Sequence, residues 1–376
     1  MKKIVPFVSL ILILCGCSDN GRLKITVYNP LAIDRSSESV ELSIADLANK
    51  SGDFDPSGVI ITDSKGTEVP SQIIYAGETK PLSIIFQPVV APDSKSVYYI
   101  KKGGSRAYEP RTFGRFVPER MDDYAWENDR IAFRIYGTAL IEKDGPSNGL
   151  DVWIKRTDRM VIDRWYADYL AGKNTYHDDN GEGCDCYKVG RTLGAGAMAP
   201  YVNDSLWLGI NFESQETLDN GPLRTTFRLK YPAFFVNGTL VTETRTISLD
   251  AGSQLTKITE EYTGMENDFP VAAGIVKRAE GKVLDLPSET PAIAYSLDGG
   301  EGGITYVGTV LTTPVTGKKE ISDHILIVTT CKPGQSLTYY TGAGWSKWGF
   351  DTDKSWTDYL TSYHLKLQNP LKVTIE

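Results

Sequence analysis

TLVTETRTISL, residues 239–249, decides the fold class of this chain. Successive side chains of a β-strand point to opposite faces. One face collects Leu240, Thr242, Thr244, Thr246 and Ser248, and the other collects Val241, Glu243, Arg245, Ile247 and Leu249. Both faces therefore mix apolar and polar side chains. This mixture is typical of a wide antiparallel sheet in which part of one face lines a polar cleft.

Similar short segments surround this stretch. They are rich in β-branched and aromatic residues and are bounded by Gly, Pro, Asp or Ser, which predicts strands. They lie at 130–136, 150–155, 205–213, 223–231, 254–262, 303–311 and 324–330. Only 160–171 and 353–361 are typical of helices, and both are short. Because no unit repeats at a fixed period, propellers and solenoids are disfavoured. We predict an antiparallel β-supersandwich over residues 120–376.

The first part of the chain has the same character. Strands are predicted at 22–28, 38–44, 58–62, 82–87 and 96–101. Together they predict a small β-sandwich domain over 22–105. Residues 106–119 carry Pro110 and Pro118 without any periodicity, so we place a linker there. The predicted fold class is all-β, with two domains and few short helices.

The N-terminus reads as an export signal. Lys2 and Lys3 precede an apolar stretch, 4–14, that is too short to span a bilayer. Leu-Cys-Gly-Cys at 14–17 then matches the lipobox of bacterial lipoproteins. We predict a signal peptide over 1–16, a lipid-modified Cys17 and a tether over 17–21. The protein is then anchored in the outer membrane of the cell envelope, on the periplasmic or the surface face. The alternative is an ordinary cleaved signal with a chance cysteine.

Charge and cysteine content narrow the partners. Loss of Lys2 and Lys3 with the signal peptide takes the net charge from −8 to −10. An acidic chain without a basic run disfavours nucleic acid as a partner. Three cysteines then remain, Cys184, Cys186 and Cys331, an odd number. A bridge from Cys331 to one of the other two and a Cys-x-Cys metal site are the weaker alternatives to free thiols.

The densest polar segment is TYHDDNGEGCDCY, residues 175–187. A histidine can gain or lose a proton near neutral pH, so His177 is the candidate general base or acid. Tyr187, or else Tyr176, is its candidate proton-transfer partner. This chemistry serves β-elimination of uronides, in which a base removes the proton next to the carboxylate, and it also serves epimerisation.

The same loop permits a second interpretation. Asp179, Glu182 and Asp185 carry the hard oxygen ligands that calcium prefers. Their spacing differs from that of an EF-hand loop. Calcium is therefore the one alternative to a cofactor-free site.

A second constellation lies at 126–136. Arg130, Arg134 and Tyr136 alternate with apolar residues, so two guanidiniums and a phenol are predicted on one strand face. Guanidinium groups bind carboxylates in a bidentate fashion, which suits a uronate. The alternative is a pair of exposed arginines on a solvated face.

Three further residues are predicted to shape the sugar subsite. They are Glu127, Trp153 and Lys155. A third constellation, YYTGAGWSKWGF at 339–350, combines small residues with aromatic ones. It predicts a loop that closes over a ligand with Trp345 as a platform, and a structural corner is the equal alternative.

Several common enzyme motifs are absent from the sequence. It contains no Gly-x-Ser-x-Gly elbow, no His-Glu-x-x-His, no P-loop and no dinucleotide fingerprint. Serine hydrolases of the elbow type, zincins and nucleotide-dependent enzymes of these classes are therefore disfavoured.

Five segments resemble, in the same order, an uncharacterised family of bacterial lipoproteins with a galactose-mutarotase-like fold. They are WENDRIAFRIYGTAL, GLDVWIKR, YHDDNGEGCDCYKVGRTLGAGA, ETRTISLDAGSQLTKITEEY and YYTGAGWSKWGF, and the resemblance covers about 120–362. Residues 22–105 are similar to the small β-domain that often precedes this supersandwich. The resemblance implies a role in using pectin-type polysaccharides. It implies no settled catalytic residues, and the mutarotase Asn-His pattern is not recognisable.

Three hypotheses follow. The first is an enzyme that processes uronate-containing oligosaccharides by acid–base chemistry, of the lyase or epimerase type. The second is a glycan-binding lipoprotein without catalysis. The third is a glycoside hydrolase with a carboxylate pair, such as Glu182 with Asp179 or Glu127. The partner in each case is an oligosaccharide, and the sequence does not predict the oligomeric state.

Overall fold

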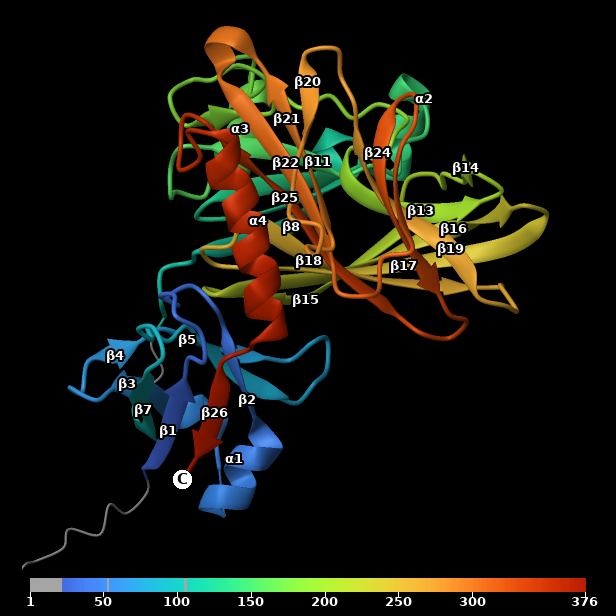
Figure 1. The fold of residues 1–376 in the computed structure, drawn as a ribbon. Helices are drawn as coiled ribbons and strands as arrows, with labels where there is room; N and C mark the ends of the chain where they lie inside the picture. Colours follow the sequence, from blue (N-terminus) through green and yellow to red (C-terminus); the bar gives the residue numbers. More distant parts are fainter. Residues whose placement is uncertain (1–21, 53, 105–106) are drawn as a thin grey trace, which may run out of the picture.

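The structure, a computed structural model, describes residues 22–52, 54–104 and 107–376 (Figure 1). Within these residues, strands β1 to β26 form five antiparallel sheets, accompanied by helices α1 to α4 and a few 3-10 turns. This confirms the predicted antiparallel all-β class. The predicted modification of Cys17 and the signal peptide lie outside the described residues. No helix in the described part of the chain is long and apolar enough to cross a membrane.

The smaller unit is a β-sandwich of two sheets. The first has the order β26 (Lys372–Ile375), β1 (Leu23–Tyr28), β7 (Lys95–Lys102), β3 (Val59–Asp63) and β4 (Glu68–Val69). The second has the order β2 (Val40–Ser43), β6 (Ser83–Phe86) and β5 (Ser71–Ile74), and α1 (Ile44–Ser51) follows β2. Alternate residues of β1, such as Ile25 and Val27, are fully buried against Leu42 and Phe86 of the second sheet. We call this unit the small sandwich.

The last strand of the chain belongs to this small sandwich. β26 pairs with β1 in antiparallel register, Ile25 opposite Ile375. The predicted domain limits, 22–105 and 120–376, place the last strand in the larger domain, so they did not anticipate the pairing of β26 with β1. In other respects these limits stay a prediction. In Figure 1, α4 (Asp353–Gln368) runs from the large sheets down to the small sandwich and leads into β26.

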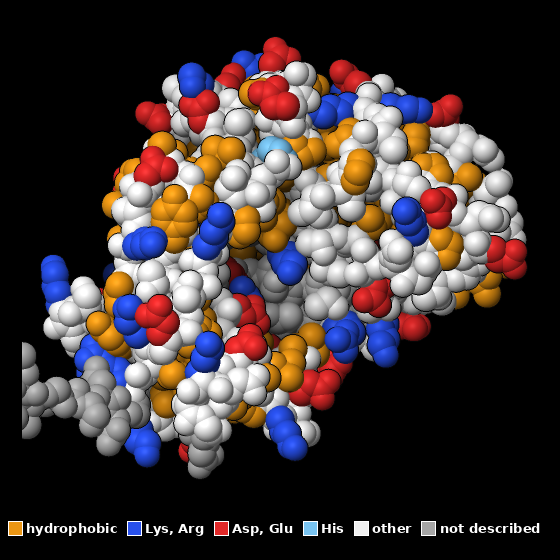
Figure 2. All heavy atoms as spheres, turned by 60° about the horizontal axis from the view of Figure 1, so that its bottom comes forward, with side chains coloured by type: hydrophobic (Ala, Val, Ile, Leu, Met, Phe, Trp, Pro, Cys, Tyr) orange, Lys and Arg blue, Asp and Glu red, His pale blue; other side chains and the backbone are white. Residues whose placement is uncertain are grey.

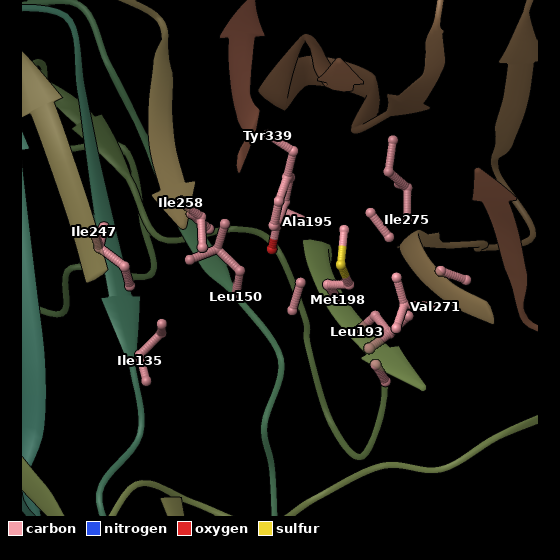
Figure 3. Packing of buried hydrophobic residues seen from close by; sticks show 14 of the residues in the cluster. Ile135, Leu150, Leu193, Ala195, Met198, Ile247, Ile258, Val271, Ile275 and Tyr339 are labelled. Atoms are coloured by element: carbon pink, nitrogen blue, oxygen red, sulfur yellow. The ribbon is translucent and has the colours of Figure 1, made fainter. Parts of the chain in front are cut away.

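The larger unit is built on an eight-stranded sheet. Its order is β15 (Ser214–Asn220), β16 (Arg224–Val236), β17 (Thr239–Asp250), β18 (Leu255–Thr263), β25 (Leu337–Trp345), β22 (Ile304–Leu311), β21 (Ala292–Asp298) and β20 (Gly281–Leu284). A five-stranded sheet packs on it, in the order β14 (Ser205–Leu206), β13 (Ala195–Val202), β19 (Phe269–Val276), β24 (His324–Cys331) and β23 (Gly317–Glu320). Figure 3 shows apolar side chains from both sheets meeting in one core, Ile247 and Ile258 from the first, Met198 and Val271 from the second.

A third sheet of this larger unit carries four of the predicted site residues, Glu127, Arg134, Trp153 and Lys155. Its order is β12 (Gly183–Cys184), β11 (Asp151–Lys155), β10 (Ile131–Ile135), β9 (Asp123–Asn128) and β8 (Thr112–Val117). One face, with Phe133 and Ile135, packs into the main core. The opposite face is covered by α3 (Ile162–Leu170), whose Trp165 and Tyr166 pack on Trp153.

Some predicted elements differ from those observed. Only 205–206 of the predicted strand 205–213 is a strand, as β14. The predicted helix at 353–361 continues to Gln368 as α4, and α1 and α2 (Ile141–Asp144) were not predicted. α4 is held by Trp356, which is fully buried and donates its indole N–H to the Val307 carbonyl at 3.2 Å.

The two faces of β17 have different surroundings. The face that carries Glu243 and Arg245 is buried in the protein core, and Ser248 on the opposite face lines a cavity beside α4. Arg245 pairs with Glu243 at 2.6 Å and with Glu260 of β18 at 2.8 Å. Its guanidinium also donates to the carbonyls of Asn148 and Met198. The charges are tolerated in the core because they are paired and hydrogen-bonded there.

Candidate functional site

A cavity of about 230 Å³ opens between the turn that joins β9 to β10 and the turn after β25. We call it the Arg130 pocket, and its lining is Arg130, Ile131, Ile154, Lys155, Gly252, Gln254, Ala343, Gly344, Trp345, Trp348, Gly349, Phe350 and Tyr359. Arg130, Lys155 and Trp345 were predicted as site residues. The second and third sequence constellations therefore meet in one cavity.

The β9–β10 turn positions Arg130. The Asn128 side-chain oxygen accepts hydrogen bonds from the backbone N–H groups of Arg130, at 2.8 Å, and Ile131, at 3.0 Å. An Asn side chain that bonds its own backbone in this way fixes a tight turn. Across the cavity, the backbone N–H of Trp348 donates to the backbone carbonyl of Trp345 at 3.0 Å and closes the opposite turn. Both walls are therefore fixed by local hydrogen bonds.

Arg130 is the free cation of the pocket. Its side chain is exposed, and its guanidinium carbon lies 5.9 Å from the centroid of the Trp348 ring. Within 22–52, 54–104 and 107–376, no carboxylate forms an ion pair with it. An unpaired guanidinium beside an indole face can bind a carboxylate through two parallel hydrogen bonds while the ring packs on a ligand.

Lys155 and Glu127 have a different role from the predicted one. Their side chains are fully buried and pair at 2.6 Å. The other Glu127 oxygen accepts the backbone N–H groups of Val161 and Ile162, at the start of α3. Burial raises the pKa of Glu127, against the opposing effect of Lys155. Because Lys155 is neutralised and Glu127 is sealed by α3, neither is a free sugar-binding group, and that prediction is corrected.

The other guanidinium of this constellation, Arg134, is buried on the α3-covered face of the third sheet. It donates to Asp151 at 2.5 Å and to Asp185 at 2.7 Å, and Asp123 lies 3.9 Å away. We call Arg134 with these three carboxylates the Arg134 cluster. The predicted partnership of Arg130 and Arg134 on one ligand is therefore corrected. Arg130 precedes the strand and lies in the turn, whereas Arg134 lies inside the fold.

Aromatic side chains enclose the Arg134 cluster. Tyr136 donates to Asp151 at 3.0 Å, and Arg134 donates to the Tyr176 hydroxyl at 3.2 Å. Trp153 is fully buried, and its ring is stacked with that of Tyr176 at 5.1 Å between centroids. Tyr136 and Trp153 are therefore packing groups of this cluster and do not face a sugar subsite.

Burial favours the protonated form of carboxyl groups in the Arg134 cluster. Burial raises the pKa of Asp123 to about 7, although Arg134 and Arg120 oppose the shift. Burial and the neighbouring Asp151 carboxylate raise the pKa of Asp185 as well, against the effect of Arg134. Burial therefore favours the protonated forms of Asp123 and Asp185, and the guanidiniums of Arg134 and Arg120 oppose this effect.

His177 lies at the outer edge of this cluster. Its Nδ1 is 3.1 Å from the Asp185 carbonyl oxygen and 3.4 Å from the Asp185 carboxylate. About half of its side chain, 49%, is exposed, and its ring lies 4.6 Å from that of Tyr176. When Nδ1 carries the proton and faces Asp185, Nε2 is an acceptor that can act as a base.

Tyr187 does not lie beside His177. It is buried in the main core, and its hydroxyl donates to the Gly194 carbonyl at 3.3 Å. Burial raises its pKa far above the ordinary tyrosine value, which makes it a poor proton donor or acceptor. The predicted partnership is therefore corrected, and Tyr176 is the tyrosine that contacts His177.

The three carboxylates predicted to bind calcium face three different arginines. Asp179 pairs with Arg156 at 2.9 Å, Glu182 pairs with Arg164, and Asp185 pairs with Arg134. In the part of the chain that the structure describes, no three His, Cys, Asp or Glu side chains form a metal-binding group. The geometry that the calcium prediction requires is therefore missing. The same pairing removes Glu182 and Asp179 as a free catalytic pair.

The loop at 175–187 and the Arg130 pocket lie on adjacent sides of β11. Arg156, which pairs with Asp179, has its guanidinium carbon 5.8 Å from the ring of Trp345 in the pocket wall. Cys184, opposite Ile154 in the sheet, packs on the same indole. All three described cysteines are free. The 175–187 segment therefore borders the Arg130 pocket, to which the 126–136 and 339–350 segments contribute.

Sequence reasoning missed four contributors to the pocket. They are Gln254, Trp348, Phe350 and Tyr359. Trp348 and Phe350 belong to the aromatic segment that was singled out, and the choice of Trp345 alone was too narrow. Gln254 lies in the turn before β18, and Tyr359 lies on α4. Nothing in their local spacing indicates that the fold brings them to Arg130.

Comparisons with known proteins agree with this architecture. The chain is 29% identical over 394 residues to "Uncharacterized protein P7" of Formosa agariphila, covering 96% of this chain and 95% of that protein. Two solved structures have a similar fold, a glycosyl hydrolase family 38 protein from Enterococcus faecalis (TM-score 0.53, 11% identity) and an α-mannosidase from Enterococcus faecalis V583 (TM-score 0.52, 10% identity).

Each of these two matches covers 94% of this chain, which spans 47% and 46% of the two solved chains, a little under half their length. They show similarity of fold. A family model described as Domain of unknown function (DUF4861) matches residues 27–373, nearly the whole of the described structure. The chain belongs to this family.

Proposed function

We propose that this chain is a carbohydrate-active lipoprotein of the cell envelope that binds a uronate-containing, pectin-type oligosaccharide in the Arg130 pocket. The observation that carries the proposal is the unpaired guanidinium of Arg130 beside the Trp348 ring. Of the other cations near the pocket, Lys155 and Arg156 are already paired with carboxylates, and Lys347 lies with its Nζ 5.3 Å from the centroid of the Trp345 ring. The fold is similar to that of proteins described as a glycosyl hydrolase and an α-mannosidase, which supports a carbohydrate ligand.

The pocket supplies both kinds of contact that an acidic sugar needs. The guanidinium matches the planar, bidentate geometry of a uronate carboxylate. The Trp348 and Phe350 rings offer apolar faces to the C–H groups of a pyranose. Gly349, with a φ of +86°, has no protein atom within 4 Å of the place where a Cβ would stand, so a sugar ring can approach the backbone there.

Calorimetric titration tests this proposal. Trigalacturonate is expected to bind the wild-type chain, and Arg130→Gln is expected to weaken binding at least tenfold, because the charge-assisted hydrogen bonds are lost. Arg159→Gln is the matched control, since Arg159 is 79% exposed and, among the described residues, its one ion-pair contact is Glu182 at 3.9 Å. Equal affinities of wild type and Arg130→Gln, or no binding by wild type, would contradict the proposal.

A second candidate function is acid–base catalysis by His177, favoured by the contact of its Nδ1 with Asp185. In β-elimination, Nε2 takes the proton from C5 of the uronate. The electron pair of that C–H bond forms the C4=C5 double bond, and the C4–O bond breaks with departure of the glycosidic oxygen. In epimerisation, a proton returns to C5 from the opposite face. In either reaction, a paired carboxylate lowers the energy of the enolate.

Product analysis distinguishes catalysis from binding alone. Elimination gives an unsaturated uronide with a new ultraviolet absorbance, and epimerisation changes the sugar NMR spectrum without a change in mass. His177→Ala should abolish either change while trigalacturonate still binds. Unchanged products with wild type, together with retained affinity, would leave the chain a glycan-binding protein.

The lipid anchor is part of the proposal. Cys17 lies outside the described residues, and the lipobox pattern at 14–17 supports its modification. The full chain is expected in the membrane fraction of an expressing cell, and Cys17→Ser is expected in the soluble envelope fraction. Equal partition of the two would contradict anchoring through Cys17.

A further inference from the structure

We infer that the Arg130 pocket continues across Tyr359 into a second sugar subsite beside α4, so that the ligand is an extended oligosaccharide. This inference rests on the proposed function and names the form of its ligand. A second cavity, of about 400 Å³, lies between α4, the eight-stranded sheet and the small sandwich. We call it the α4 groove. Figure 2 looks from the side of the small sandwich and shows acidic and basic side chains around a hollow between the two units.

The two cavities are contiguous. Gly252 and Tyr359 line both of them. The Tyr359 hydroxyl accepts the backbone N–H of Gln254 at 3.0 Å, so this ring is fixed at the junction. Gly252 has a φ of +79°, and its N–H donates to Asp129 at 2.6 Å, which holds the backbone of the junction in a turn. A ligand that leaves the Arg130 pocket past Tyr359 enters the α4 groove directly.

A row of aromatic rings joins the two cavities. Phe350 lies 5.5 Å from Tyr359, Tyr359 lies 5.9 Å from Tyr363, and Tyr363 lies 5.1 Å from Tyr340, measured between ring centroids. Tyr359 and Tyr363 are four residues apart on α4 and therefore lie on one helix face. All four rings are partly exposed. Steps of this size are comparable to one sugar unit, so the row offers successive stacking faces to a glycan.

The polar groups of the groove differ from those of the Arg130 pocket. Arg224 is shared between Glu41, at 2.9 Å, and Asp250, at 2.6 Å. Lys366 lies 3.7 Å from Glu38, so most charge in the groove is balanced. These groups offer donors and acceptors to sugar hydroxyls, and Lys257, which also lines the groove and pairs with no carboxylate among the described residues, offers a cation to a second uronate. The Arg130 pocket would thus bind the carboxylate of one uronate, and the α4 groove would bind neighbouring sugar units of the oligosaccharide.

Chain-length dependence of binding tests this inference. The probes are galacturonate oligomers of one to six units, titrated into the full chain. Affinity is expected to rise with length by at least tenfold between the dimer and the hexamer. Tyr363→Ala is expected to lower hexamer affinity about tenfold and to leave dimer affinity unchanged. Tyr363→Phe, which keeps the ring, is the matched control and should retain hexamer affinity.

The possible outcomes separate the two proposals. If the dimer binds but affinity does not rise with length, or if Tyr363→Ala leaves hexamer affinity unchanged, the second subsite is overturned and the Arg130 pocket stands. If no oligomer binds, the proposed function itself fails. A loss of dimer affinity in Tyr363→Ala would assign Tyr363 to the support of Tyr359 and would also overturn the second subsite.

Discussion

Two buried arginines hold similar networks in different parts of the larger unit. Arg245 is enclosed in the main core with Glu243 and Glu260, and tyrosines surround all three. Arg134 is enclosed beneath α3 with the three carboxylates of the Arg134 cluster and with Tyr176, and His177 continues this network to the surface. Both guanidiniums are less than 6% exposed. The networks differ in whether any member reaches solvent.

This difference separates a structural network from a candidate site. A charge network that has no solvent-exposed member can only fix the packing of the strands around it. The Arg134 cluster also fixes packing, but through Asp185 it contacts the half-exposed ring of His177. Buried charge by itself is therefore no sign of function, and the exposed member of a network is the one to test.

The largest expected effect comes from removing the sealed arginine. Arg245→Met leaves two buried glutamates without a cation and is expected to lower the free energy of unfolding by about 3–5 kcal/mol. Arg134→Met is expected to cost less, about 2 kcal/mol, because Arg120 still acts on Asp123 and Asp185, and His177 still lies beside Asp185. Urea unfolding followed by tryptophan fluorescence measures both. Equal losses would remove the distinction between the two networks.

The next effect is a pH dependence confined to the Arg134 cluster. The pKa of Asp123 is about 7 in the folded chain and near 4 when unfolded. Between these values the folded state holds a proton that the unfolded state has lost, so stability falls as pH rises from about 4 to about 7. Asp123→Asn removes this slope. Its stability relative to wild type should rise by roughly 2–4 kcal/mol over that interval.

Unfolding of both proteins at several pH values checks this expectation. The difference between them isolates Asp123 from all other titrating groups, provided that the variant keeps the native circular dichroism spectrum. A constant difference across pH 4 to 8 would show that Asp123 titrates normally. The cluster would then be as fully compensated as the Arg245 network.

A smaller effect is expected for Tyr176→Phe. The hydroxyl accepts from Arg134 at 3.2 Å and from Arg120 at 3.1 Å, so its loss removes two hydrogen bonds to cations. The ring and its contact with His177 remain. Stability should fall by about 1–2 kcal/mol, and thermal unfolding measures it. No change would indicate that water replaces the hydroxyl, which would make the cluster more open than its contacts suggest.

The smallest effect on stability is expected in the exposed part of the 175–187 loop. Glu182 pairs with Arg164, whose side chain is 49% exposed. Glu182→Gln is expected to change stability by no more than about 0.5–1 kcal/mol, because exposed ion pairs contribute little. The same urea titration applies. A loss comparable to that of Arg134→Met would show that the acidic loop is itself a core element.

Much of the fold could be predicted from the sequence. The alternation in β17 and β18 and the turn residues between strands indicated an antiparallel sheet, because these features are local. The return of β26 to β1 could not be predicted, since pairing of Ile375 with Ile25 depends on how the whole chain is arranged. Periodicity shows that Glu243 and Arg245 share one face of β17, but it does not show what covers that face.

The site was predicted in part for the same reason. Arg130 and Trp345 were found because charged and aromatic residues stand out in strand and turn segments. Tyr187 was chosen over Tyr176 although both flank the same loop, and only the fold places one in the core and the other beside His177. Tyr359 approaches the pocket from α4, and no sequence pattern connects it with Arg130.

The central claim is that the Arg130 pocket binds the uronate. A crystal structure of the full chain soaked with trigalacturonate tests it most directly. We expect a carboxylate within hydrogen-bond distance of the Arg130 guanidinium and a sugar ring against Trp348. A sugar bound elsewhere on the molecule while the Arg130 pocket holds only water would contradict the account.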